Sequence, residues 1–319
     1  MTLGIDAQVL DEMAPLLAAI GESEPLAVGD VEGRRRDGHR MFDTVAARRA
    51  APTGVGVTDF TLTTEDGATL LMRWYERAGE RPGSAALYLH GGGMILALEH
   101  IGALYEIAVR DYVAASGVPV LMVDYRVAPE HPHPTPVEDC YTALRWLVGN
   151  AEALGVDPAR IAVMGDSAGG GLAAGVCLLA RDRGGPAIAQ QILIYPMLDD
   201  RPGTPDPALQ PYLTWTYDDN LTGWGALLGD AAGSDAVSPY AAPARATDLR
   251  DLPPAYLDVG DLDIFRTEDI AYAMRLADAG VSTELHVYPG CPHAFEALAH
   301  NAGVSKRAIS DRVRRLRNL

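Results

Sequence analysis

Short apolar segments alternate with helical patterns along most of this chain, and this alternation constrains the fold more than any other sequence feature. The apolar segments are rich in Val, Ile and Leu, as strands buried on both faces are. Because helical patterns separate most of them, we expect a mostly parallel sheet covered by helices on both faces. The expected strands are residues 57–63, 68–75, 85–89, 118–123, 160–164, 191–195, 255–259 and 283–288, and the clearest helices are 101–116, 136–154, 167–183 and 267–280.

Three parts of the chain depart from this alternation. The acidic turn Glu65-Asp66-Gly67 joins the first two strands as a hairpin, so the sheet is not expected to be purely parallel. Residues 1–50 are helix-like, and residues 197–250 are rich in Pro, Gly, Asp and aromatic residues. Since a long structureless loop is uncommon inside a compact domain, both segments are expected to form a helical cap. The catalytic core would then consist of residues 51–196 and 251–319.

The charge of the chain limits its partners. Its 319 residues include 43 acidic side chains against 26 Lys and Arg, a formal net charge of −17. This charge repels phosphate backbones and anionic lipids, so neither nucleic acid nor a membrane is expected as a partner. The basic stretch from Lys306 to Arg317 has near-helical spacing and is expected to be the solvated face of a last helix.

Other expectations concern location, metals and cofactors. No apolar run approaches the roughly 18 residues of a membrane span, and the N-terminus carries acids where a signal peptide needs positive charge, so a cytoplasmic protein is expected. Cys140, Cys177 and Cys291 are too scattered for a disulfide framework or a zinc site. His131-Pro132-His133 has no further ligands at matching spacing. Neither a metal nor a cofactor is therefore expected.

The strongest chemical motif is Gly165-Asp166-Ser167-Ala168-Gly169, which lies between an expected strand and an expected helix. In this G-x-S-x-G pattern a sharp turn exposes the serine hydroxyl at strained backbone angles. The residues two before and two after the serine must then lack side chains, and Gly165 and Gly169 meet this need. Ser167 is predicted to be a nucleophile.

A dinucleotide-binding loop is a weaker interpretation of the same region. Gly169-Gly170-Gly171 with Ala174 fits the glycine fingerprint of such loops. That fingerprint also needs an acid at the end of the next strand to bind a ribose, and residues 191–195 contain none. The serine motif is therefore the preferred interpretation.

A second glycine-rich motif, His90-Gly91-Gly92-Gly93, ends the expected strand at 85–89. Consecutive glycines let the backbone approach a bound acyl group and direct N–H groups at the oxygen that becomes negative during attack. The N–H of Ala168, directly after the nucleophile, would be a further donor. By itself the run could be a phosphate loop or a simple turn. Beside the serine motif it predicts an oxyanion hole formed by Gly91, Gly92 and Ala168.

A nucleophilic serine needs a general base, and in enzymes with this motif the histidine follows the serine in the chain. His286, His293 and His300 qualify by position. His286 lies inside an expected strand, where its side chain would be packed, and His300 is a helix away from the loop. His293 lies in that loop, whose prolines and glycine can hold an imidazole at the edge of the sheet. His293 is the predicted base.

Four motifs in this order resemble a known family. They are HGGG at 90–93, Asp124-Tyr125-Arg126-Val127-Ala128-Pro129-Glu130-His131-Pro132, GDSAGG at 165–170 and Pro292-His293-Ala294-Phe295. Over roughly residues 57–300 the chain resembles the hormone-sensitive-lipase-like bacterial carboxylesterases. The resemblance implies a capped α/β-hydrolase fold, hydrolysis of short to medium acyl esters and, usually, a homodimer. Met94 stands where that family more often has an aromatic residue.

Two aspartates compete for the third place in a catalytic triad. Asp261 and Asp263 both lie in the loop after the expected strand at 255–259, and position alone does not choose between them. The resembled family carries an Asp-Pro-Leu-Arg-Asp-Glu motif whose first aspartate orients the histidine. Asp263-Ile264-Phe265-Arg266-Thr267-Glu268 keeps its acid, apolar, Arg and Glu positions in register. The resemblance therefore implies Asp263, with Asp261 as the alternative.

These residues predict two-step acyl transfer. His293 would take the proton of Ser167 during attack on an ester carbonyl and return it to the leaving alcohol, and water would then release the acid. An amidase or an acyltransferase with the same triad differs only in leaving group or acceptor. A non-catalytic ligand-binding protein on the same fold would lack the nucleophile or the base, and both are present here.

Overall fold

The computed structural model describes residues 3–20, 25–79, 83–201 and 203–319, and a single eight-stranded sheet lies at its centre. The strand order is β1-β2-β4-β3-β5-β6-β7-β8. β2 is antiparallel to both of its neighbours, and all other neighbouring strands are parallel. The expected sheet with its one hairpin is thus confirmed. The strands are β1 (Val55–Thr63), β2 (Thr69–Arg77), β3 (Ala85–Leu89), β4 (Val120–Val123), β5 (Ile161–Asp166), β6 (Gln190–Ile194), β7 (Ala255–Gly260) and β8 (Thr283–Tyr288).

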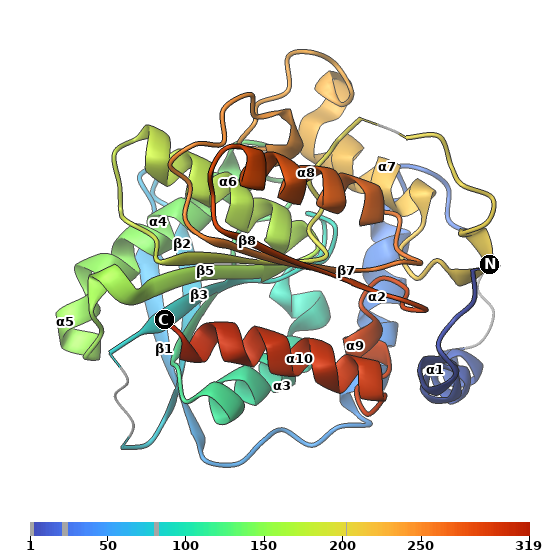
Figure 1. Cartoon of the computed structure of the whole chain (residues 1–319), viewed down its shortest axis with the longest axis horizontal. Helices are drawn as coiled ribbons and strands as arrows, with labels where there is room; N and C mark the ends of the chain where they lie inside the picture. Colours follow the sequence, from blue (N-terminus) through green and yellow to red (C-terminus); the bar gives the residue numbers. More distant parts are fainter. Residues whose placement is uncertain (1–2, 21–24, 80–82, 202) are drawn as a thin grey trace.

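Helices cover both faces of the sheet, and each face has its own apolar core. One face is covered by α4 (Thr135–Gly149), α6 (Ala168–Asp182) and α8 (Arg266–Asp278), and the other by α3 (Leu98–Ser116) and α10 (Gly303–Arg317) (Figure 1). The expectation of a single helix at 136–154 is wrong. Asn150 interrupts it with a non-helical backbone, and a separate short helix, α5 (Ala151–Leu154), follows.

α6 is the most deeply buried helix, since every residue from Ala168 to Ala180 is buried. Many of these residues are glycine or alanine, so neighbouring segments approach the helix backbone closely. At Gly175 an added Cβ would lie 2.5 Å from the carbonyl oxygen of Tyr240. The absence of a side chain there lets the segment around Tyr240 lie directly on α6.

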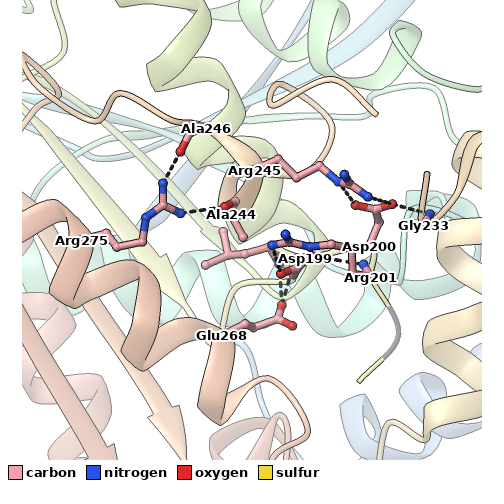
Figure 2. A network of polar contacts seen from close by, with 10 residues as sticks. Asp199, Asp200, Arg201, Gly233, Ala244, Arg245, Ala246, Glu268 and Arg275 are labelled. Carbon is pink, nitrogen blue, oxygen red and sulfur yellow. Dashed lines mark hydrogen bonds and ion pairs between the residues drawn. The ribbon is translucent and has the colours of Figure 1, made fainter. Parts of the chain in front are cut away.

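Residues 197–250 contain α7 (Tyr217–Leu228) and several short turns, and polar contacts tie this segment to the core (Figure 2). Glu268 of α8 accepts hydrogen bonds from the N–H groups of Leu198 and Asp199, at 2.7 and 3.2 Å. Arg275, also on α8, donates to the carbonyl oxygen of Ala244 at 2.6 Å. Within the segment, Arg245 pairs with the fully buried carboxylate of Asp200. The segment is therefore held on α8 at both of its ends.

The N-terminal region forms two helices with different neighbours. α1 (Ala7–Ile20) packs its apolar side chains, including Val9 and Leu16, against α9 (Phe295–Leu298). α2 (Val31–Ala46) packs on α3 and α7, and Arg34 on α2 forms a 2.8 Å ion pair with Asp219 on α7. α2 therefore joins the N-terminal region to the segment at 197–250. Within the described residues, no helix is long and apolar enough to cross a membrane.

The expectation of a solvated basic face on the last helix is wrong for one residue. Arg312 of α10 is fully buried, with 0% of its surface exposed. It forms ion pairs of 2.6 Å with Asp258 and with Glu296. Spacing alone could not reveal this, because the buried partners of Arg312 come from β7 and α9, far away in the sequence.

The contact between α6 and the segment at Tyr240 leads to a stability prediction. Gly175→Ala should lower the free energy of unfolding by about 1–3 kcal/mol, because the added methyl group meets a backbone oxygen that must move. Gly149→Ala is the matched control. This helical glycine has no atom within 4 Å of the added Cβ, and alanine should stabilise by up to about 1 kcal/mol. Urea unfolding measures the stability of both variants. If the two are equally stable, the segment around Tyr240 can move away from α6 without a cost in free energy.

Candidate active site

Ser167 lies on the sharp turn between β5 and α6, with φ 55° and ψ −122°. The chain is tightly packed around this turn. An added Cβ at Gly165 would lie 2.2 Å from the carbonyl oxygen of Gly169, and one at Gly169 would lie 2.0 Å from that of Leu89. Both glycines are thus required by close approach of the backbone, as the motif predicts.

Ser167, His293 and Asp263 are brought together in one hydrogen-bonded row. The hydroxyl of Ser167 lies 3.0 Å from Nε2 of His293, and Nδ1 of His293 lies 2.6 Å from Oδ2 of Asp263. The second oxygen of Asp263 accepts the N–H of Phe265 at 3.0 Å, which fixes the carboxylate. This arrangement can remove a proton from the serine, and the buried carboxylate can stabilise the imidazolium that forms.

The charge of Asp263 acts on the acidity of His293. Burial by itself lowers the pKa of His293, but the charge and hydrogen bond of Asp263 act in the opposite direction and the pKa is raised overall. The imidazole packs edge to face with two rings, Tyr195 at 4.7 Å and Phe265 at 5.2 Å. Its position is therefore set by these two ring contacts as well as by the hydrogen bonds of its two nitrogens.

The other candidates from the sequence have different contacts. Asp261 accepts the N–H of Gly290 at 2.7 Å, so its carboxylate holds the loop that leads to His293. His286 lies on β8, where Nε2 is 2.7 Å from Glu284. His300 lines the same cavity as Ser167, but among the described residues it is His293 and not His300 that forms a hydrogen bond with the serine hydroxyl.

A cavity of about 700 Å³ opens at Ser167 and His293. Its walls come from the core, from α2 and from the segment at 197–250. The core contributes Gly92, Gly93 and Tyr195, α2 contributes Met41 and Phe42, and the segment contributes Trp215 and Tyr217. Its size suits a small organic molecule in contact with the serine.

The structure places two of the three HGGG glycines at this cavity. Gly92 and Gly93 line it, with φ of 109° and 61° that favour glycine. Within the described residues, neither of their N–H groups donates to any acceptor. The expectation that Gly91 donates to the oxyanion needs correction, since its N–H donates to the hydroxyl of Tyr105 at 2.8 Å and is not free for a ligand. Ala168 is the first residue of α6, so its N–H has no acceptor within the helix.

A buried polar cluster underlies the glycine loop. Tyr105 of α3 accepts the N–H of Gly91 and donates to Asp166 at 2.6 Å, and Tyr88 donates to the other oxygen of Asp166 at 2.8 Å. Burial raises the pKa of Asp166 to about 6, although both tyrosine hydroxyls oppose this rise. Tyr105 was missed from the sequence, because a tyrosine in a helix carries no signal of its partners.

The described part of the chain holds no group of three or more His, Cys, Asp or Glu side chains arranged to share a metal ion. Its three cysteines are unpaired and buried. Burial raises the pKa of the Cys291 thiol to about 12, so this thiol is protonated at neutral pH.

Known proteins resemble this chain over most of its length. A family model described as the alpha/beta hydrolase fold matches residues 86–297. The chain is 32% identical over 311 residues to the ethyl acetate hydrolase of Pseudomonas putida, with 92% of each protein covered. A bacterial heroin esterase superposes with a TM-score of 0.86 at 36% identity, covering 98% of this chain and 97% of that one. A hyperthermophilic esterase from the archaeon Pyrobaculum calidifontis superposes with a TM-score of 0.84 at 31% identity, covering 99% of each chain.

The contact between Tyr105 and Gly91 is tested by comparing two tyrosines. Tyr105→Phe and Tyr88→Phe each remove one donor to Asp166, but only Tyr105→Phe also leaves the buried N–H of Gly91 without an acceptor. Tyr105→Phe should therefore lower the free energy of unfolding by about 1–3 kcal/mol more than Tyr88→Phe. Urea unfolding at one pH gives both values. Equal losses would mean that the Gly91 N–H finds another partner.

Proposed function

Because the chain belongs to the hormone-sensitive-lipase-like bacterial carboxylesterases of the alpha/beta hydrolase fold, we propose that its ester hydrolysis uses Ser167 as nucleophile, His293 as general base and Asp263 as orienting acid. The chain is a serine carboxylesterase, and enzymes of this fold act through an acyl-enzyme. The observation that carries the assignment of residues is the hydrogen-bonded row from Ser167 through His293 to Asp263.

The reaction begins when Ser167 attacks the ester carbonyl. His293 Nε2, 3.0 Å from the hydroxyl, takes its proton, and the carboxylate of Asp263 stabilises the imidazolium that forms. His293 then gives the proton to the leaving alcohol, which departs from the acyl-enzyme. A water molecule activated by the same imidazole attacks the acyl group, and the acid is released with Ser167 restored.

The oxyanion of each tetrahedral intermediate is bound by the N–H groups of Gly92, Gly93 and Ala168 in this proposal. Gly92 and Gly93 line the cavity beside Ser167, and their N–H groups have no acceptor within the described residues. Ala168 begins α6, where the helix dipole also favours negative charge. Gly93 takes the place that the sequence assigned to Gly91, because the N–H of Gly91 is already bonded to Tyr105.

The substrate is proposed to be an ester of a short to medium acyl chain. A cavity of about 700 Å³ and the similarity to an ethyl acetate hydrolase support this choice. An amidase or acyltransferase reaction is less well supported, since the similar proteins described above are named as ester hydrolases. A homodimer and a cytoplasmic location stay predictions from the sequence.

The cap is proposed to consist of α2 and the segment at 197–250. Phe42 from α2 and Trp215 from the segment line the cavity, and the Arg34–Asp219 ion pair joins the two parts. An added Cβ at Gly93 would lie 2.2 Å from the indole of Trp215, so this ring lies against the proposed oxyanion loop. α1 is left out of this proposed cap, since it packs against α2 and α9 and none of its described residues lines the cavity.

The cap proposal predicts a change in acyl-chain preference. Trp215→Ala should open space beside Gly93 and raise kcat/KM for p-nitrophenyl octanoate relative to the acetate by roughly tenfold, because a few methylenes then fit. Leu221→Ala is the matched control, since Leu221 lies on α7 of the same segment with 42% of its surface exposed. The chain-length series is measured for both variants. An unchanged profile in Trp215→Ala would remove Trp215 from the substrate site.

The triad is tested by replacing each of the two competing aspartates with asparagine. Asp263→Asn should lower kcat roughly 10⁴-fold, because the asparagine cannot stabilise the imidazolium and favours the wrong tautomer of His293. Asp261→Asn should stay within about tenfold of the parent, since Asp261 bonds Gly290 rather than the imidazole. Steady-state kinetics on p-nitrophenyl acetate measure both. If both variants fold and Asp261→Asn loses far more activity than Asp263→Asn, the triad acid is Asp261.

A further inference from the structure

A buried charge cluster lies behind the base, and the reaction described above does not use it. Its centre is Arg312 of α10, which is fully buried. Arg312 binds Asp258 of β7 through two nitrogens, at 2.6 and 2.8 Å, and binds Glu296 of α9 through a third at 2.6 Å. It also donates to the hydroxyl of Tyr112 on α3 at 3.2 Å. Burying these charges costs several kcal/mol per ion unless they pair well, so a role beyond packing is worth testing.

Two contacts connect this cluster to the imidazole. Glu296 lies three residues after His293, on α9, and its Oε1 accepts hydrogen bonds from both Arg312 and the hydroxyl of Tyr195, each at 2.6 Å. The ring of Tyr195 packs edge to face on His293 at 4.7 Å, and the guanidinium of Arg312 lies over the same ring, 5.5 Å from its centroid. Glu296 and Tyr195 therefore form a bridge between Arg312 and the base.

The backbone of Tyr195 is held in place as well as its side chain. Its φ is 33°, which non-glycine residues rarely adopt, and its N–H donates to the carbonyl oxygen of Asp258 at 2.6 Å. Two residues close to it in the chain bond the backbone of Ser167, whose N–H donates to Ile194 and whose carbonyl oxygen accepts from Met197. Tyr195 thus lies in a segment bonded to the nucleophile turn, and its side chain contacts both the base and the charge cluster.

We propose that Glu296, held by Arg312 and Tyr195, is a positioning residue for His293 that fixes the imidazole and stabilises the imidazolium formed when Ser167 attacks. This inference rests on the proposed roles of Ser167 and His293. Glu296 lines the substrate cavity, and its second oxygen, Oε2, is buried without a hydrogen-bond partner among the described residues. A fixed negative charge therefore lies near the place where positive charge develops.

The charged groups around His293 set the direction of its pKa. Burial lowers this pKa, and the carboxylates that raise it are Asp263, then Asp166 of β5, then Glu296. Burial alone would raise the pKa of Glu296, but Arg312 lowers it overall, so Glu296 is ionised at neutral pH. Because the base must be neutral to accept a proton, activity rises with pH through the pKa of His293. Removing the charge of Glu296 lowers that pKa and moves the acidic limb to lower pH.

The experiment compares the two carboxylates that flank Arg312. Glu296→Gln and Asp258→Asn make the same change of charge next to the same arginine, but only Glu296 is bonded to the tyrosine that packs on His293 and is among the charges that raise its pKa. In Glu296→Gln the acidic limb of kcat/KM should move down by about half a pH unit or more, with kcat lowered roughly tenfold. In Asp258→Asn the limb should stay where it is in the parent enzyme, while the melting temperature falls by a similar amount in both variants.

Two tyrosines provide a milder pair if a charge variant fails to fold. Tyr195→Phe removes the donor to Glu296 and keeps the ring on His293, whereas Tyr256→Phe removes the equivalent donor to Asp258, 2.8 Å away. Tyr195→Phe should lower kcat by about three- to tenfold with KM within about twofold, and Tyr256→Phe should leave kcat unchanged.

The result that overturns the proposal is an acidic limb that stays in place in folded Glu296→Gln, or one that moves equally in Asp258→Asn. For the tyrosine pair, equal kcat values for the two variants overturn it. The cluster would then stabilise the fold without positioning the base. The underlying function is tested separately by Ser167→Ala, because full activity in that variant would reject the nucleophile itself, whatever the Glu296 variants show.

Discussion

The close-packed turn at Ser167 is the constraint on which the rest of the site depends. Backbone atoms approach so closely there that neither Gly165 nor Gly169 has room for a Cβ. The turn places the start of α6 over β5 and against the end of β3, which carries the glycine loop. On its other side, Ile194 at the end of β6 accepts the N–H of Ser167, and Met197 just after the strand donates to its carbonyl oxygen. Nucleophile, oxyanion loop and Tyr195 are thus placed by one set of backbone contacts.

Electrostatics around the base is a balance between burial and fixed charge. His293 is buried, which disfavours its charged form, yet Asp263, Asp166 and Glu296 together raise its pKa. Such a site stabilises an imidazolium well, because its charges are already oriented before the reaction. Arg312 keeps Glu296 ionised inside this apolar surrounding. This ion pair offsets the free-energy cost of removing the Glu296 carboxylate from water, a cost that nothing would offset if the carboxylate were isolated.

Local signals in the sequence predicted most of the fold and the central chemistry. Apolar runs of strand length located β3 to β7 to within a few residues, because a strand buried on both faces is continuously apolar. A further run located β8, and the acidic turn at 65–67 indicated the hairpin of β1 and β2. Ser167 could be recognised because its turn requires glycines at fixed spacing, and His293 because it lies in a rigid loop after β8. The choice of Asp263 over Asp261 needed the family motif, since both aspartates lie in the same loop.

By itself, then, the sequence determined the sheet and the strand–turn–helix at Ser167, and it indicated His293 as the proposed base, since these signals depend on residues close together in the chain. Only the tertiary structure decided that the N–H of Gly91 is taken by Tyr105 and that Arg312 is buried against Asp258 and Glu296. It also decided that Tyr195 touches the base. Each of these contacts joins residues from different elements, and their hydrogen bonds depend on how the helices pack on the sheet, which no local pattern of residues encodes.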